Sequence, residues 1–85
     1  MKTKVLIVDD EEEFLETLAE RLESRGISVA TATDGAKAIQ LIEKETFHAI
    51  FLDYAMPGIN GLETLKIMLQ KKPDLLIYFL TGRAT

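Results

Sequence analysis

Short apolar runs alternate along the chain with longer segments in which apolar residues recur at helical spacing. The runs are mostly aliphatic or β-branched, which is typical of short strands buried in a parallel sheet. They lie at residues 5–8, 28–32, 49–52 and 75–80. The pattern therefore predicts four strands with an amphipathic helix between each pair of successive strands.

Each predicted helix carries a start or stop signal. The first covers residues 11–25 and is followed by Gly26, a common helix stop. Asp34 precedes the second helix and Asn60 the third, and both residue types are favoured N-caps. Pro73 interrupts the chain before the last strand. The helix residues predicted to share an apolar face are Phe14, Leu15, Leu18 and Leu22, then Ala38, Ile39, Leu41 and Ile42, then Leu62, Leu65, Met68 and Leu69.

The strict alternation of strands and helices predicts an α/β fold. Strands joined through helices form a parallel sheet with right-handed crossovers. The 85 residues have room for one small domain, and no repeat or linker divides them.

Composition narrows the classes of function. The net charge is −4 and no basic stripe is present, so neither direct nucleic-acid binding nor attachment to an anionic membrane is expected. The absence of cysteine excludes disulfides, zinc–thiolate sites and thiol catalysis. The apolar run at residues 5–8 is too short for a signal peptide or a membrane span. A cytoplasmic location fits this composition.

Polar side chains follow three of the predicted strands at the point where each strand ends. Asp9 and Asp10 come directly after the first strand, Asp53 after the third, and Thr81 after the fourth. In open α/β sheets the ligand site lies beyond the carboxyl ends of the strands. The three carboxylates and the hydroxyl are therefore predicted to converge, provided that the first and third strands are neighbours.

Carboxylates crowded in this way repel one another. At ~4 Å, two like charges cost about 4 kcal/mol at an effective dielectric constant of about 20. Protonation could offset this repulsion, but a hard divalent cation such as Mg²⁺ does so better, because it prefers oxygen ligands and leaves room for water and a phosphate oxygen. One carboxylate can then attack phosphorus and form an acyl phosphate. The pattern predicts a Mg²⁺-dependent phosphoacceptor site.

Simpler interpretations exist for these residues taken singly. Asp10 with Glu13 fits a capping box at the start of the first helix, and Asp53 fits a turn-forming aspartate before Pro57. Capping is compatible with metal binding at Asp10, and the joint placement of the acids favours the metal site. His48, the single histidine, precedes a strand and is interpreted as a surface or strand-entry residue.

Four short motifs occur in order along the chain. They are Val5-Leu6-Ile7-Val8-Asp9-Asp10, Ala32-Thr33-Asp34-Gly35-Ala36 with Ala38, Asp53-Tyr54-Ala55-Met56-Pro57-Gly58 followed by Asn60-Gly61, and Leu80-Thr81-Gly82. In this order and spacing they resemble the chemotaxis-type receiver domain of bacterial two-component response regulators. The resemblance implies a flavodoxin-like doubly wound fold, with the order 2-1-3-4 for the strands present.

The resemblance also implies a role for each site residue. Asp53 would accept the phosphoryl group and contribute to Mg²⁺ binding. Asp10 would ligate Mg²⁺ directly and Asp9 largely through water, and the backbone carbonyl of Ala55 would complete the protein ligands. Thr81 would be the switch hydroxyl that contacts the phosphoryl group.

Two further expectations come from the same resemblance. The residues two positions past the acceptor and past the switch hydroxyl, here Ala55 and Arg83, tune the lifetime of the phosphoryl group in the family. A sensor histidine kinase or a phosphotransfer protein would supply that group. The module would therefore be a signalling protein and not an enzyme in the ordinary sense.

The family domain continues beyond the last matching motif. Its fourth helix, fifth strand ending in a lysine, and fifth helix have no counterpart before Thr85, so residues 1–85 are expected to form a truncated receiver domain. The fourth strand would then be an exposed edge, with apolar side chains of the third and fourth strands uncovered on the face of the first helix. Exposed edges and apolar patches bind other chains, so self-association through the fourth-strand edge is expected.

Two other functions are compatible with parts of the pattern. A receiver fragment that is not phosphorylated could act as a structural or oligomerisation module, which the missing lysine and the exposed edge would favour. A Mg²⁺-dependent phosphatase with an aspartyl nucleophile needs a second acid two residues after the nucleophile. Ala55 stands at that position, so this function is the least favoured.

Overall fold

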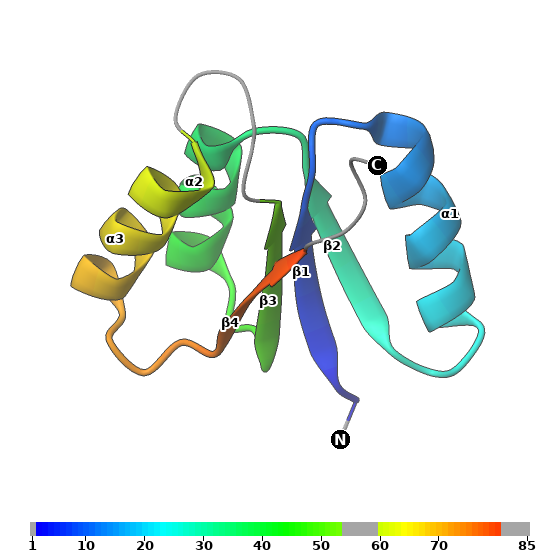
Figure 1. The fold of residues 1–85 in the computed structure, drawn as a ribbon. Coiled ribbons are helices and arrows are strands. Elements are labelled where there is room, and N and C mark those ends of the chain that lie inside the picture. Colours follow the sequence, from blue (N-terminus) through cyan, green and yellow to red (C-terminus); the bar gives the residue numbers. More distant parts are fainter. Residues whose placement is uncertain (1, 54–59, 81–85) are drawn as a thin grey trace.

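The computed structural model describes residues 2–53 and 60–80. Its elements follow in the order β1 (Lys4–Val8), α1 (Glu12–Glu23), β2 (Ser28–Ala32), α2 (Gly35–Lys44), β3 (Ala49–Asp53), α3 (Gly61–Lys71) and β4 (Ile77–Leu80). The strands form one parallel sheet in the order β2-β1-β3-β4. Figure 1 shows α1 on one face of the sheet and α2 and α3 on the other. The predicted α/β fold and strand order are confirmed.

The core has two parts because successive strand residues point to opposite faces of the sheet. Leu6 and Ile50 face α2 and α3, in a cluster that also contains Ile42 and Met68. Val5, Ile7 and Leu15 form the smaller cluster under α1. The central strand β1 is covered on both sides, by α1 on one face and by α2 on the other, which explains why its sequence is a continuous apolar run.

The predicted helix signals hold the helix ends in place. The side chain of Asp34 accepts a hydrogen bond from the backbone N–H of Lys37 at 2.8 Å, and Asn60 accepts one from that of Glu63 at 2.9 Å. After α1, Gly26 adopts a φ of 85°, a left-handed conformation that glycine enters without strain. The caps at Asp34 and Asn60 and the stop at Gly26 are confirmed.

The first helix and the last strand are shorter than their sequence patterns indicated. α1 runs from Glu12 to Glu23, within the predicted residues 11–25. β4 begins at Ile77 and not at residue 75, although the carbonyl of Leu76 already accepts a hydrogen bond from the N–H of Ile50 at 2.9 Å. An apolar run indicates which residues are buried by packing. The bounds of a strand depend instead on backbone hydrogen bonding, which here requires the chain to lie alongside β3.

The predicted apolar face of α3 is wrong at two positions. Leu62 and Leu69 are 41% and 36% exposed, whereas Thr64 is fully buried. The hydroxyl of Thr64 donates to the carbonyl of Asn60 at 2.9 Å, and this bond satisfies the polar atom inside the core. The helix therefore packs through Gly61, Thr64 and Met68, and its leucines lie to one side of that contact.

Among the described residues, α1 is the helix on its face of the sheet, and it leaves the β3 and β4 part of that face without a covering helix. An open hollow of about 290 Å³, lined entirely by apolar residues, lies between α1 and strands β1, β3 and β4. Within this part of the face, the rings of Phe51 and Tyr78 stack with centroids 5.6 Å apart, and Tyr78 remains 51% exposed. The prediction that apolar side chains of the third and fourth strands are uncovered on this face is confirmed.

No helix in the described part of the chain combines the length and apolar character needed to cross a membrane.

Candidate functional site

Asp9 directly follows the central strand β1, and hydrogen bonds fix both its backbone and its side chain. Its backbone N–H donates to the carbonyl of Ala32 at 3.1 Å, so the pairing between β1 and β2 continues to this residue. The side chain is fully buried, and its Oδ1 accepts a hydrogen bond from the N–H of Glu11 at 2.9 Å. This bond fixes the carboxylate at the turn into α1, because an aspartate that bonds the N–H two residues later closes an Asx-turn.

Asp9 therefore contributes a hydrogen bond to the start of α1. The N-cap of the helix is Glu11, whose side chain makes no capping hydrogen bond. Asp10 therefore lies one residue before the N-cap and does not occupy the N-cap position that the proposed capping box with Glu13 requires. Sequence reasoning missed the role of Asp9, although the spacing of two residues between Asp9 and Glu11 is the signal of an Asx-turn.

Asp53 is the last residue of β3 and reaches the same end of the sheet. It pairs in register with Leu80 of β4 and is 7% exposed. Because β1 and β3 are direct neighbours, Asp53 comes close to the two acids that follow β1. Asp10, the remaining member, is exposed at the start of the loop into α1.

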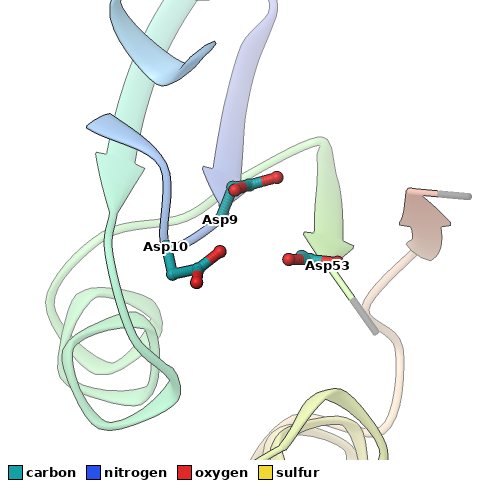
Figure 2. Close-up of side chains that lie close together, drawn as sticks. All are labelled: Asp9, Asp10 and Asp53. Atoms are coloured by element: carbon teal, nitrogen blue, oxygen red, sulfur yellow. The ribbon is translucent and has the colours of Figure 1, made fainter. Parts of the chain in front are cut away.

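The three carboxylates form one compact group. Figure 2 shows Asp9, Asp10 and Asp53 around a common space at the ends of β1 and β3, and one oxygen from each lies within 4.8 Å of the others. In the described part of the chain this is the one group of three or more such side chains close enough to hold a metal ion. The predicted convergence of the acids is confirmed.

The electrostatics of this group favour a cation. At 4.8 Å, two ionised carboxylates repel by roughly 3 kcal/mol at an effective dielectric constant of about 20. The full figure applies best to Asp9 and Asp53, which are buried, because solvent screens exposed Asp10. Hard oxygen donors without sulfur or imidazole suit Mg²⁺. The residues present therefore fit a divalent cation that takes oxygen ligands.

His48 lies at the opposite end of the sheet. Its side-chain Nδ1 accepts a hydrogen bond from the backbone N–H of Lys4 at 2.9 Å. The backbone N–H of His48 in turn donates to the backbone carbonyl of Lys4 at 2.7 Å. The residue joins the beginnings of β1 and β3. The interpretation of His48 as a strand-entry residue is confirmed.

The other predicted site residues, Ala55, Thr81 and Arg83, lie outside the described residues. Their assigned roles, namely the carbonyl ligand, the switch hydroxyl and the tuning of phosphoryl lifetime, stay predictions. Leu80, the last described residue of β4, is the register partner of Asp53.

Comparison with solved structures identifies close matches to this fold. The chemotaxis protein CheY4 of Vibrio cholerae superposes with a TM-score of 0.92 at 30% identity, over 100% of this chain and 72% of that one. TrrA of Thermotoga maritima, a response regulator solved in complex with Mg²⁺–BeF, superposes with a TM-score of 0.88 at 37% identity, over 99% of this chain and 72% of that one.

Relatives by sequence are bacterial transcriptional regulators. The alkaline phosphatase synthesis regulator PhoP of Bacillus subtilis is 39% identical over 83 residues, which are 98% of this chain and 35% of PhoP. A CpxR homologue of Haemophilus influenzae is 40% identical over 81 residues, 95% of this chain and 35% of that protein. The chain thus spans about a third of the length of these relatives.

The family comparison agrees with the fold. The sequence pattern of the response regulator receiver domain matches residues 5–85. The chain therefore belongs to the response regulator receiver domain family, the signalling modules of two-component systems.

Proposed function

We propose that this chain is a phosphoacceptor module in which Asp53 receives a phosphoryl group from a histidine kinase or a phosphotransfer protein. The observation that carries the proposal is the group of three carboxylates within 4.8 Å at the ends of β1 and β3. Residues 1–85 are proposed to act as part of one receiver unit in the cytoplasm. Membership of the receiver family and the Mg²⁺–BeF complex of TrrA support the same assignment.

Each acid has its own part in this proposal. A carboxylate oxygen of Asp53 forms a bond to phosphorus, the bond from phosphorus to the donor nitrogen breaks, and the donor nitrogen takes up a proton from solvent. Asp9 and Asp10 hold Mg²⁺ together with Asp53. Asp9 is suited to this task because its bond to Glu11 fixes the carboxylate in place. When bound, Mg²⁺ supplies positive charge against the phosphoryl oxygens.

The test of the acceptor is Asp53→Asn, exposed to phosphoramidate with Mg²⁺ and followed by intact-protein mass spectrometry. The wild-type chain should gain the mass of one phosphoryl group, and Asp53→Asn should gain none. The matched control is Asp74→Asn, which makes the same change at an exposed aspartate outside the acidic group and should be labelled like wild type. Equal labelling of Asp53→Asn and wild type would remove Asp53 as the acceptor.

A second function is favoured by a separate observation. Leu76 and Tyr78, at the β4 edge, are 56% and 51% exposed. Apolar side chains exposed at a sheet edge are typical of an association surface. The chain would then also serve as an oligomerisation module, whether or not Asp53 is phosphorylated.

A further inference from the structure

The amino ends of β1 and β3 meet at the end of the sheet opposite the acidic group (Figure 1). Here Lys4, the first residue of β1, contacts three residues of the connection between α2 and β3. Its ammonium group forms an ion pair with Glu45 and lies 5.5 Å from the centre of the Phe47 ring. Its backbone N–H and its backbone carbonyl both bond to His48. The first residue of β1 is therefore held to this connection by contacts of several kinds.

One of these contacts depends on the protonation state of the imidazole of His48. The backbone N–H of Lys4 donates to Nδ1 of that ring at 2.9 Å. A ring nitrogen accepts a hydrogen bond only when it carries no proton, so the neutral ring has its proton on Nε2. A protonated ring carries a proton on each nitrogen and has no acceptor left. The bond from Lys4 to His48 therefore requires the neutral ring.

Of the contacts that hold Lys4 within the described chain, the one with the imidazole alone changes near neutral pH. Carboxylates and ammonium groups ordinarily keep their charges between about pH 5.5 and pH 7.5, so the ion pair with Glu45 persists there. The backbone bond from His48 to the carbonyl of Lys4 contains no titrating group. Histidine side chains, in contrast, ordinarily take up a proton at about pH 6.5.

The charged side chains around His48 balance one another. They belong to β1, α2, α3 and the two connections that follow these helices. The cations are Lys4, Lys71 and Lys72, and the anions are Glu43, Glu45 and Asp74. Lys4 is paired with Glu45, and Lys71 lies 3.5 Å from Glu43. Because these charges largely cancel, the loss of the acceptor on Nδ1 decides what protonation of the ring does to the structure.

We propose that His48 is a pH-sensitive clamp on the amino end of β1. At about pH 7.5 the neutral ring accepts the N–H of Lys4 and the clamp is closed. At about pH 5.5 the protonated ring releases that N–H, and the first residue of β1 separates more often from the α2–β3 connection. The rest of β1 stays paired, because its register with β3 continues from Val5 to Val8. The clamp is independent of phosphorylation at Asp53.

The clamp is tested by amide hydrogen exchange, followed by NMR, on the 85-residue chain and on His48→Asn. Asparagine places an acceptor oxygen near the position of Nδ1 and does not titrate. After correction for the intrinsic effect of pH on exchange, protection of the Lys4 amide in wild type should fall about 5-fold from pH 7.5 to pH 5.5, as expected for one hydrogen bond. In His48→Asn the protection should stay constant. An equal fall in both chains, or no fall in wild type, would overturn the proposal.

Two controls accompany this experiment. His48→Ala removes the acceptor at an exposed position and should show the low protection of the Lys4 amide at both pH values. The amide of Ile50 donates to the carbonyl of Leu76 at 2.9 Å, a bond without a titrating group. Its corrected protection should be the same at both pH values in every chain, and a parallel fall there would show general loosening of the sheet and not a clamp.

The bond itself is observed by ¹⁵N NMR of the imidazole in wild type. At about pH 7.5 the ring should be the Nε2–H tautomer, and the amide nitrogen of Lys4 should show scalar coupling to Nδ1 of His48 across the hydrogen bond. At about pH 5.5 this coupling should be absent. A ring that carries its proton on Nδ1 near neutral pH would overturn the clamp, and this result does not depend on whether any variant folds.

Discussion

Two regions of the molecule contrast in how their side chains interact: the acidic group at the carboxyl end of the sheet, and the β4–α3 surface, which consists of exposed Leu62, Leu69, Leu76 and Tyr78. Asp9, Asp10 and Asp53 carry like charges within 4.8 Å of one another, so the fold holds them together against their repulsion. The apolar side chains of the β4–α3 surface do not repel one another, and removing them from water lowers the free energy. The chemistry of the first region is therefore suited to a small cation, and that of the second to contact with apolar groups.

Both regions depend on β3. Its last residue, Asp53, brings the acids together, and its open-side neighbour, β4, presents the apolar edge. The two regions are nevertheless chemically separable, because a cation would relieve repulsion only in the first and apolar contact would cover only the second. The following predictions use this separation.

The largest effect in stability should come from Mg²⁺. At a Mg²⁺ concentration of 100 times its dissociation constant, a ligand that binds only the folded state stabilises it by about 2.7 kcal/mol. For a domain of this size that corresponds to a rise in melting temperature of roughly 10 °C or more. Thermal melts with increasing Mg²⁺ measure the shift, and Tyr78→Lys should show the same shift as wild type. A melting temperature that ignores Mg²⁺ contradicts the assignment of the acidic group.

A smaller effect is expected for Asp10→Asn without metal. Removing one of three like charges should raise the free energy of unfolding by about 1 kcal/mol, less than the value for a buried pair because Asp10 is exposed. The same change should remove most of the stabilisation by Mg²⁺ and leave self-association unchanged. Urea unfolding at low salt, with Asp74→Asn as the control, measures both. A metal-free Asp10→Asn chain less stable than wild type would argue against repulsion within the group.

The smallest effect is expected for Lys71→Ala. The ion pair to Glu43 spans 3.5 Å between side chains that are 42% and 53% exposed, and exposed pairs of this kind contribute about 0.5 kcal/mol or less. Buried Thr64 and Met68, rather than the ion pair, should hold α3 against the core. Denaturant unfolding and sedimentation of Lys71→Ala should therefore both resemble wild type, and a large loss of self-association would show that the ion pair orients the leucine side of α3.

Local signals in the sequence predicted the ends of helices correctly where a single residue sets the backbone conformation. Asp34 and Asn60 cap their helices as predicted, and Gly26 adopts the positive φ that ends α1. Such signals are reliable because the capping bond or the left-handed conformation involves only a few adjacent residues. The start of α1 was harder to predict. Asp9 and Asp10 are adjacent, and either carboxylate could have accepted a hydrogen bond from a backbone N–H at the start of the helix.

The sequence pattern did not predict which side of α3 is buried against the core. Leucines at 62, 65 and 69 form as regular a stripe as the residues that are actually buried. The rotation of the helix follows from its neighbours, since Thr64 and Met68 fit the core while Lys71 reaches Glu43 on α2. The exposed leucines, and with them the β4–α3 surface, became visible only in the folded chain.

The sequence by itself determined the order of strands and helices and placed an acid at the end of the first and third strands. It did so because periodicity and capping depend on residues close together in the chain. Only the tertiary structure decided that β1 and β3 lie side by side, which brings Asp9, Asp10 and Asp53 together. Among the described strands, the same order places β4 last, because strand neighbours are set by packing over the whole chain and not by the strands' own residues.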